Sequence, residues 1–118
     1  MHVEQVDFVA VPTRDVSRAV AFYRDVLGLP ASEFADGEVE APNVTLSFWN
    51  PERDGEEFAP NVAGIALRVE DVATAVDEVR AAGGVVMGVE DTGVCRMGFV
   101  RDPDGNTVIL HRRYAARG

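Results

Sequence analysis

The stretch DVSRAVAFYR at residues 15–24 returns as DVATAVDEVR at residues 71–80, 56 positions further along the chain. Identical residues continue on both sides at the same shift, as in Gly28 and Gly84. Two copies of a unit of about 50 residues are too few for a solenoid. We therefore expect two half-domains that pair with pseudo-twofold symmetry, with a cleft at their junction.

Composition restricts the class of protein. A chain of 118 residues with 47% hydrophobic and 26% charged side chains is expected to form one domain over residues 1–118. Its formal net charge of −9 argues against nucleic acid as a partner. No apolar stretch is long enough to cross a bilayer and no export signal is visible, so no membrane partner is expected. The single cysteine, Cys95, fits a reducing, cytoplasmic location.

Each half predicts the element order β-α-β-β-β. Asp15 and Asp71 are expected N-caps, and apolar residues follow them at helical spacing until glycines end the helices. The strands expected after the helices cover about 31–35, 38–41 and 43–49 in the first half and 85–90, 94–101 and 106–112 in the second. The fold class is thus α/β (α+β), with two βαβββ modules forming a curved mixed sheet around a cleft. Module 1 is expected at about 1–50, a linker at 51–61, module 2 at about 62–112 and a tail at 113–118. The C-terminus carries Arg112, Arg113 and Arg117 and is expected to be solvated.

Two motifs carry a family resemblance. VRDPDGNTVIL at residues 100–110, with FYRDVLGL at residues 22–29, resembles the vicinal oxygen chelate superfamily. That superfamily includes glyoxalase I, extradiol dioxygenases, fosfomycin-modifying enzymes and bleomycin-resistance proteins. The segment 102–106 itself is expected to be a turn between two antiparallel strands, which marks the fold and is not catalytic.

The resemblance also locates a metal site. Enzymes of the superfamily hold a divalent metal with four side chains, usually His, Glu or Gln, from the first and last strand of each half. Carried over by register, these positions fall on Phe8, Ser47, Gly64 and Ile109. Phe, Gly and Ile offer no donor atom and Ser is a poor ligand alone. The resemblance therefore implies no metal, no cofactor and no catalytic residue, and it favours a protein that is not an enzyme.

Two other reactive side chains have ordinary interpretations. His111 lies two residues beyond Ile109 on the same strand face, but one histidine does not supply the three or four donors that a metal requires. Cys95 stands beside Arg96, which favours a thiolate, although a lone cysteine is more often a small buried residue. We assign neither residue a catalytic role.

Period-two alternation predicts which side chains line the cleft. Phe8 and Trp49 offer flat apolar faces, although core packing of Trp49 is an equal alternative. The expected ligand-binding residues are Phe8, Ser47, Trp49, Gly64, Arg68, Ile109 and His111. A mostly apolar lining with a few polar groups is typical of a ligand pocket.

The function expected from this site is metal-independent binding of a small aromatic or cationic molecule, resembling drug-sequestering proteins of the bleomycin-resistance type. The resemblance further implies a homodimer, and the acidic rim would attract cations. One alternative is a metal-dependent glyoxalase-like or dioxygenase-like enzyme whose ligands lie in another register. The other is a non-catalytic module with an empty cleft.

Overall fold

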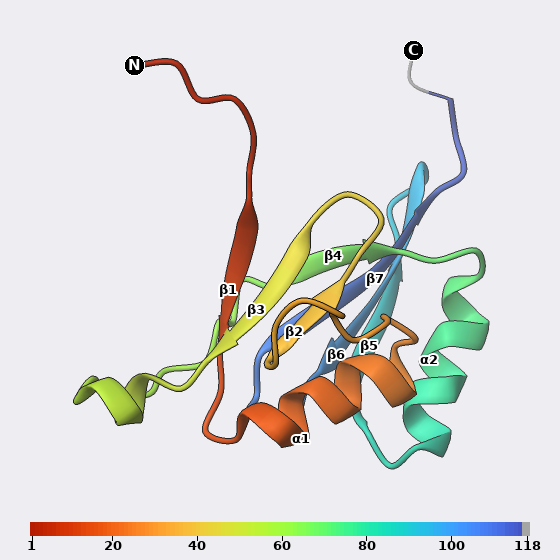
Figure 1. Cartoon of the computed structure of the whole chain (residues 1–118). Coiled ribbons are helices and arrows are strands. Elements are labelled where there is room, and N and C mark those ends of the chain that lie inside the picture. Colours follow the sequence, from red (N-terminus) through yellow and green to blue (C-terminus); the bar gives the residue numbers. More distant parts are fainter. Residues whose placement is uncertain (117–118) are drawn as a thin grey trace. The chain divides into compact units, whose positions relative to one another are not determined.

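The chain divides into two units that follow the internal repeat. A computed structural model of the chain describes residues 1–116 (Figure 1). The division lies between Ala59 and Pro60, and we call residues 1–59 unit 1 and residues 60–118 unit 2. Within residues 1–116, no helix is long and apolar enough to cross a membrane.

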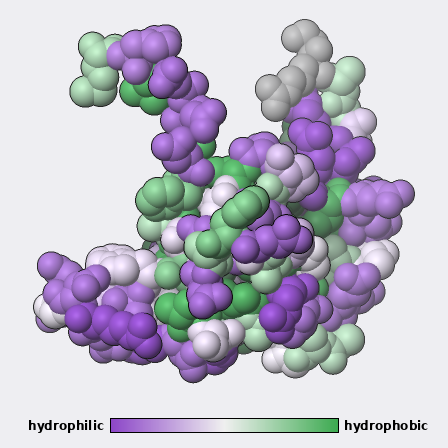
Figure 2. Space-filling view, viewed as in Figure 1, coloured by the Kyte–Doolittle hydropathy of each residue, from purple (hydrophilic) through white to green (hydrophobic). Residues whose placement is uncertain are grey.

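Unit 1 is a three-stranded mixed sheet with one helix. Its elements are β1 (Phe8–Pro12), α1 (Val16–Ala21), the π-helical turn η1 (Phe22–Val26), β2 (Glu38–Glu40), β3 (Thr45–Trp49) and the 3-10 helix η2 (Pro51–Asp54). The strand order is β1-β3-β2, with β1 parallel and β2 antiparallel to β3. Figure 2 shows hydrophilic side chains gathered over η2, as expected for the polar linker sequence.

Unit 2 repeats this arrangement with longer strands. Its elements are β4 (Ile65–Arg68), α2 (Val72–Ala81), β5 (Val85–Asp91), β6 (Cys95–Arg101) and β7 (Thr107–Arg113). The order is β4-β7-β6-β5, in which β4 is parallel to β7 and the other pairs are antiparallel. The first and last strands of each unit are thus parallel neighbours, which confirms the α+β fold class predicted from the repeat.

The predicted N-caps are confirmed by their hydrogen bonds. The Asp15 carboxylate accepts the backbone N–H of Arg18 at 3.0 Å, and the Asp71 carboxylate accepts that of Thr74 at 2.9 Å. Each bond satisfies one of the N–H groups that a helix start leaves unpaired. The first helix ends through η1, where the N–H of Leu27 reaches the carbonyl of Phe22 at 3.2 Å.

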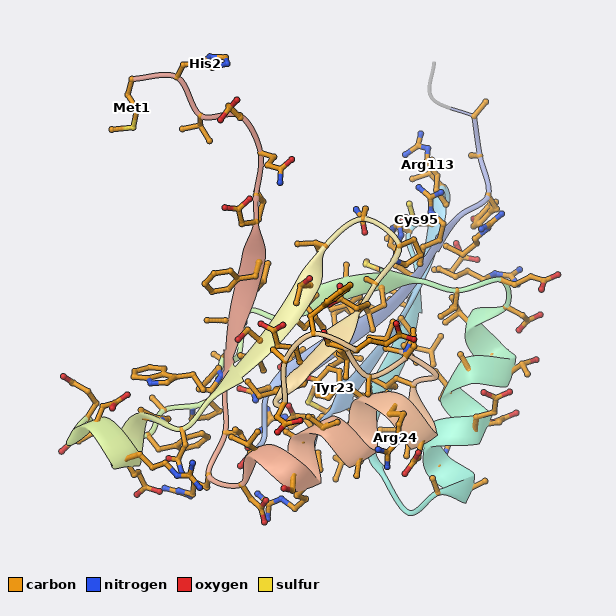
Figure 3. The ribbon with its side chains drawn as sticks, in the orientation of Figure 1. Met1, His2, Tyr23, Arg24, Cys95 and Arg113 are labelled. Carbon is orange, nitrogen blue, oxygen red and sulfur yellow. The ribbon has the colours of Figure 1, made fainter. Side chains whose placement is uncertain are left out.

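Each unit buries one face of its sheet under its own helix. In unit 1 the Tyr23 side chain, labelled in Figure 3, is only 1% exposed. Its ring centroid lies 4.8 Å from that of Phe48. In unit 2 Val72, Val76 and Val79 of α2 are buried, as are Val100 of β6 and Val108 and Leu110 of β7. A Cβ atom on Gly98 of β6 would lie 2.5 Å from Cγ2 of Val76. Glycine is therefore what allows α2 to approach β6 so closely.

The turn expected at residues 102–106 is confirmed, and Asp102 organises it. Its Oδ1 accepts the backbone N–H groups of Asp104 and Asn106, each at 2.9 Å, while its Oδ2 accepts the Asn106 side-chain amide at 2.8 Å. The Asn106 Oδ1 then accepts the N–H of Asn61 at 2.7 Å. The motif therefore has a structural role in unit 2, since it joins the β6–β7 turn to the start of the unit.

Two sequence-based expectations are wrong. The strand expected at 31–35 is reduced to a single bridge between Ala31 and Val39, because the following residues form local turns. There the Ser32 hydroxyl accepts the N–H of Phe34 at 3.1 Å. The expectation of a solvated C-terminus is confirmed for Arg112, which is exposed, and wrong for Arg113, which ends β7 and is half-buried. Arg117 lies outside the described residues.

Candidate ligand-binding site

Unit 1 leaves one face of its sheet uncovered by α1, and Phe8, Ser47 and Trp49 share that face. Along β3 the buried residues Leu46 and Phe48 alternate with Thr45, Ser47 and Trp49. The parallel register pairs Phe8 with Thr45 and Pro12 with Trp49. Phe8 is 58% exposed and Trp49 is 43% exposed. Trp49 was expected either to line the cleft or to pack in the core, and its exposure within the described chain shows that core packing is wrong.

Carboxylates border this aromatic face. The strand β2 places Glu38 beside Ser47 and Glu40 beside Thr45. The Thr45 hydroxyl donates to Glu40 Oε2 at 2.6 Å, which fixes that carboxylate on the face. The Trp49 indole N–H donates to Asp54 Oδ2 at 2.7 Å and so ties the ring to η2. The face therefore combines exposed aromatic rings with negative charge.

The four candidate residues of unit 2 lie along β4 and β7. The register pairs Ala66 with Ile109 and Arg68 with His111, and Gly64 immediately precedes β4. Leu110 and Val108 point to the helix side, so Ile109 and His111 lie on the opposite, open face. The alternation predicted from the sequence is thus present in both units.

A hollow of about 470 Å³ on unit 2 is lined by residues outside the expected ligand-binding set. It is mostly apolar, with Met87 and Phe99 in its wall, and its polar side chains are Glu90, Arg101 and Thr107. The Arg101 Nε–H donates to the Met87 sulfur at 2.9 Å. Two of these residues could have been found from the sequence. Side chains alternate between the two faces along the strand expected at 94–101, and the turn at 102–106 sets its register. Together they place Phe99 beside Ile109 and Arg101 beside Thr107.

The backbone at Gly64 disfavours any residue that has a side chain. Its φ is +98°, a conformation that L-residues with a side chain rarely adopt. A Cβ atom there would also lie 3.1 Å from Cγ2 and 3.2 Å from the carbonyl oxygen of Thr107. A metal-ligand side chain at this position would therefore be strained at this φ, and Thr107 would have to shift by a few tenths of an ångström.

A polar cluster lies where β5 ends, β6 begins and β7 ends. The Tyr114 hydroxyl donates to Asp91 Oδ1 at 2.6 Å, and the Arg96 guanidinium lies 3.6 Å from Asp91 Oδ2. The hydrogen bond from Tyr114, helped by the N–H of Gly93, lowers the pKa of Asp91. The same bond raises the pKa of Tyr114, because ionised tyrosine would lose it and face the carboxylate.

Comparison with known proteins identifies the family. The model of the Glyoxalase/Bleomycin resistance protein/Dioxygenase superfamily matches residues 5–110. The chain belongs to this superfamily. It is 34% identical over 110 residues to a lactoylglutathione lyase of Haemophilus influenzae, covering 77% of this chain and 79% of the relative. A probable lactoylglutathione lyase of Synechocystis sp. is 30% identical over 112 residues, with 81% and 86% covered.

Solved structures of other proteins share the fold. TnmS3, an antibiotic binding protein from Streptomyces sp., superposes with a TM-score of 0.79 at 23% identity, covering 97% of this chain and 99% of the other. A lactoylglutathione lyase from Agrobacterium tumefaciens gives 0.75 at 20% identity, with 93% and 94% covered. These similarities concern the fold alone.

The donor chemistry of this superfamily member does not fit the superfamily's metal. Phe8, Gly64 and Ile109 have no side-chain donor, and Ser47 offers one hydroxyl. Among the described residues, no three His, Cys, Asp or Glu side chains are grouped so as to hold a metal ion.

Proposed function

We propose that this superfamily member binds a small, planar, cationic aromatic molecule without a metal ion. The observation that carries the proposal is the open face of unit 1, where Phe8 and Trp49 are exposed and Glu38 and Glu40 lie on the neighbouring strand. Aromatic faces attract flat apolar molecules and cations, and carboxylates favour the same charge. The superfamily resemblance to TnmS3, an antibiotic binding protein, supports a binding role by analogy.

The geometry also favours an extended ligand. Phe8 pairs with Thr45 at one end of the strand pair and Trp49 pairs with Pro12 at the other, four residues away. Four residues of strand correspond to about 13 Å. Between the two rings lie Ala10 and Ser47, which are small. A molecule of about three fused rings would rest on this floor and reach both aromatic side chains.

The test uses 9-aminoacridine, which is cationic at pH 8, and acridine, which is neutral there and has the same ring system. We expect 9-aminoacridine to bind more tightly by calorimetry and to quench the fluorescence of Trp49, the single tryptophan. Phe8→Ala should weaken binding by roughly 1–2 kcal/mol, the loss expected for a buried aromatic contact. Phe34→Ala is the matched control, because Phe34 is 95% exposed and lies in a loop.

Two outcomes would overturn the proposal. Equal affinity for acridine and 9-aminoacridine would show that Glu38 and Glu40 do not attract the cationic ligand. Equal loss of affinity in Phe8→Ala and Phe34→Ala would show that binding does not involve the open face of unit 1.

A second candidate is a metal-dependent lyase. It is favoured by the 34% and 30% identity to proteins named as lactoylglutathione lyases. It would require metal ligands outside the four superfamily positions, drawn from Glu4, Asp7, His111 or the acids near 36–40. Metal analysis of the purified protein separates the two candidates: we expect no stoichiometric divalent metal and no effect of chelators on the melting temperature. One tightly bound metal ion per chain would favour the lyase.

We further propose that the binding form is a cytoplasmic homodimer. The resemblance to bleomycin-resistance proteins supports pairing, and the free thiol of Cys95 suits a reducing compartment. Size-exclusion chromatography with light scattering at several protein concentrations measures the molar mass and so tests the dimer. The mass of a monomer at every concentration would contradict it.

A further inference from the structure

A second hollow of unit 2, separate from the apolar one, is rich in arginine. It has a volume of about 520 Å³ and lies at the C-terminal end of β7. Its basic lining residues are Arg68, His111, Arg112 and Arg113, and Tyr114, Ala115 and Ala116 complete it. Arg68 and His111 are register partners, and Arg113 follows two residues later along β7.

The positive charge of this hollow is not compensated by a direct ion pair among the described residues. Elsewhere in unit 2, Arg80 pairs with Asp77 at 3.0 Å and Arg96 with Asp91 at 3.6 Å. Within residues 1–116, by contrast, Arg68, Arg112 and Arg113 form no ion pair with a carboxylate. None of the lining residues of the hollow is acidic. In a chain with 20 acidic residues and 11 arginines, this clustering is unexpected.

Glu70 and Asp71 border the adjoining hollow on unit 2, which also contains Arg96 and shares Arg112, Arg113 and Tyr114. The Asp71 carboxylate is engaged there by the N–H of Thr74 at the start of α2. These two carboxylates lower the positive potential near the hollow. In the part of the chain that the structure describes, neither of them forms an ion pair with an arginine of the hollow.

Arg113 supplies an independent observation. Its Nε atom is shielded from solvent and has no hydrogen-bond acceptor among the described residues. One of its terminal nitrogens, Nη2, donates only to the carbonyl of Ala116, at 3.3 Å. The residue pairs in register with Cys95 at the end of the sheet, where both are labelled in Figure 3. A buried charged donor without an acceptor is unfavourable, and an oxyanion would provide the missing acceptor.

We propose that this hollow binds the oxyanion of a small molecule, a carboxylate or a phosphate, with Arg113 as its principal donor. The planar guanidinium presents two parallel N–H groups, Nε–H and Nη–H, that match the two oxygens of such a group. Arg68 and Arg112 add positive charge at the exposed rim. The site lies in unit 2 and takes the opposite charge from the aromatic face of unit 1, so it does not depend on the function proposed above.

The test is a titration of ¹⁵N-labelled protein with inorganic phosphate and, separately, with succinate, at constant ionic strength. Binding should move the Nε–Hε resonance of Arg113 downfield, because that proton gains a charged acceptor. The tighter of the two probes identifies the class of anion. Arg113→Gln should weaken binding roughly tenfold or more, and Arg113→Lys should recover only part of the affinity because it keeps the charge but loses the fork.

The matched control is Arg53→Gln, which removes the same charge from η2 in unit 1. It should leave the affinity within about twofold. Arg68→Gln provides a second test if Arg113→Gln fails to fold, since Arg68 is exposed and its loss removes no described ion pair. The proposal is wrong if saturating probe leaves the Arg113 Nε–Hε resonance in place, if chloride causes the same shift, or if Arg53→Gln weakens binding as much as the hollow variants do.

Discussion

Replacement of Gly98 by alanine tests the packing that defines unit 2. Gly98 lies in the middle of β6, beneath α2. A Cβ atom there would stand 2.5 Å from Val76 Cγ2, 3.3 Å from Val72 Cγ1 and 3.8 Å from Leu110 Cβ. Carbon atoms pack favourably at about 3.5–4.0 Å, so the contact with Val76 is short by roughly 1 Å or more. Either the Val76 side chain or α2 itself must move.

Two opposing terms decide the magnitude. Overpacking a filled core costs typically 1–3 kcal/mol. Replacing glycine by alanine restricts the unfolded chain and returns about 0.4–1 kcal/mol. The packing term is larger, and we expect Gly98→Ala to lower the free energy of unfolding by about 1–2 kcal/mol.

Urea unfolding followed by far-ultraviolet circular dichroism measures this change. Gly88→Ala on the neighbouring strand β5 is the matched control, because its Cβ would meet no atom within 4 Å. That variant should be neutral or slightly stabilised. In a Val76→Ala background the obstructing methyl groups are absent, so Gly98→Ala should become nearly neutral. An undiminished loss in that background would refute the close approach of α2 to β6 as the cause.

Three further predictions concern caps, titration and backbone. Asp15→Ala should lower the unfolding free energy by about 1 kcal/mol in chemical denaturation, whereas Asp15→Asn keeps the cap and should change it little. Tyr114 should titrate above the usual value of about 10 by ultraviolet absorbance, and Asp91→Asn should return its pKa toward that value. The stabilisation from Tyr114 is present below its unfolded pKa and is lost as pH rises through its raised folded pKa. The stabilisation from Asp91 is present above the pKa that Asp91 has in the unfolded protein. It is lost as the pH falls through the lower pKa that Asp91 has in the folded protein. Finally, Gly83→Ala and Gly64→Ala both place alanine at positive φ, which should lower the free energy of unfolding by roughly 1–2 kcal/mol. Gly64→Ala should lower it by about 1 kcal/mol more in thermal unfolding, because its Cβ atom also contacts Thr107.

The sequence predicted those features that local chemistry determines. Asp15 and Asp71 cap helices because their carboxylates bond N–H groups three residues away, a relation visible in the sequence. Alternation along Thr45–Trp49 placed Ser47 and Trp49 on one face because side chains of a strand point to opposite sides. The internal repeat supplied the topology, since both units keep the parallel pair of first and last strands.

Features that depend on contacts between distant residues could not be predicted in this way. The segment after Ala31 contains Phe34 and could have been a strand, yet it forms turns and leaves that ring exposed. Arg113 was expected in a solvated tail because it is one of three arginines near the C-terminus. Its half-burial arises from pairing with Cys95 across β6 and β7, which only the completed sheet reveals.

Gly64 differs from the other expected metal positions in its backbone conformation and, like Phe8 and Ile109, has no side-chain donor. At Phe8 and Ile109, which lie in strands, a side chain with a donor atom could in principle replace the present one without a new backbone. At Gly64 it could not, because the positive φ and the contact with Thr107 exclude any residue with a Cβ atom from an unstrained structure. A metal-ligand side chain at Gly64 would thus be strained on the present backbone, and Thr107 would have to shift by a few tenths of an ångström. A side-chain donor at this position would therefore require a change of backbone conformation as well as a change of residue.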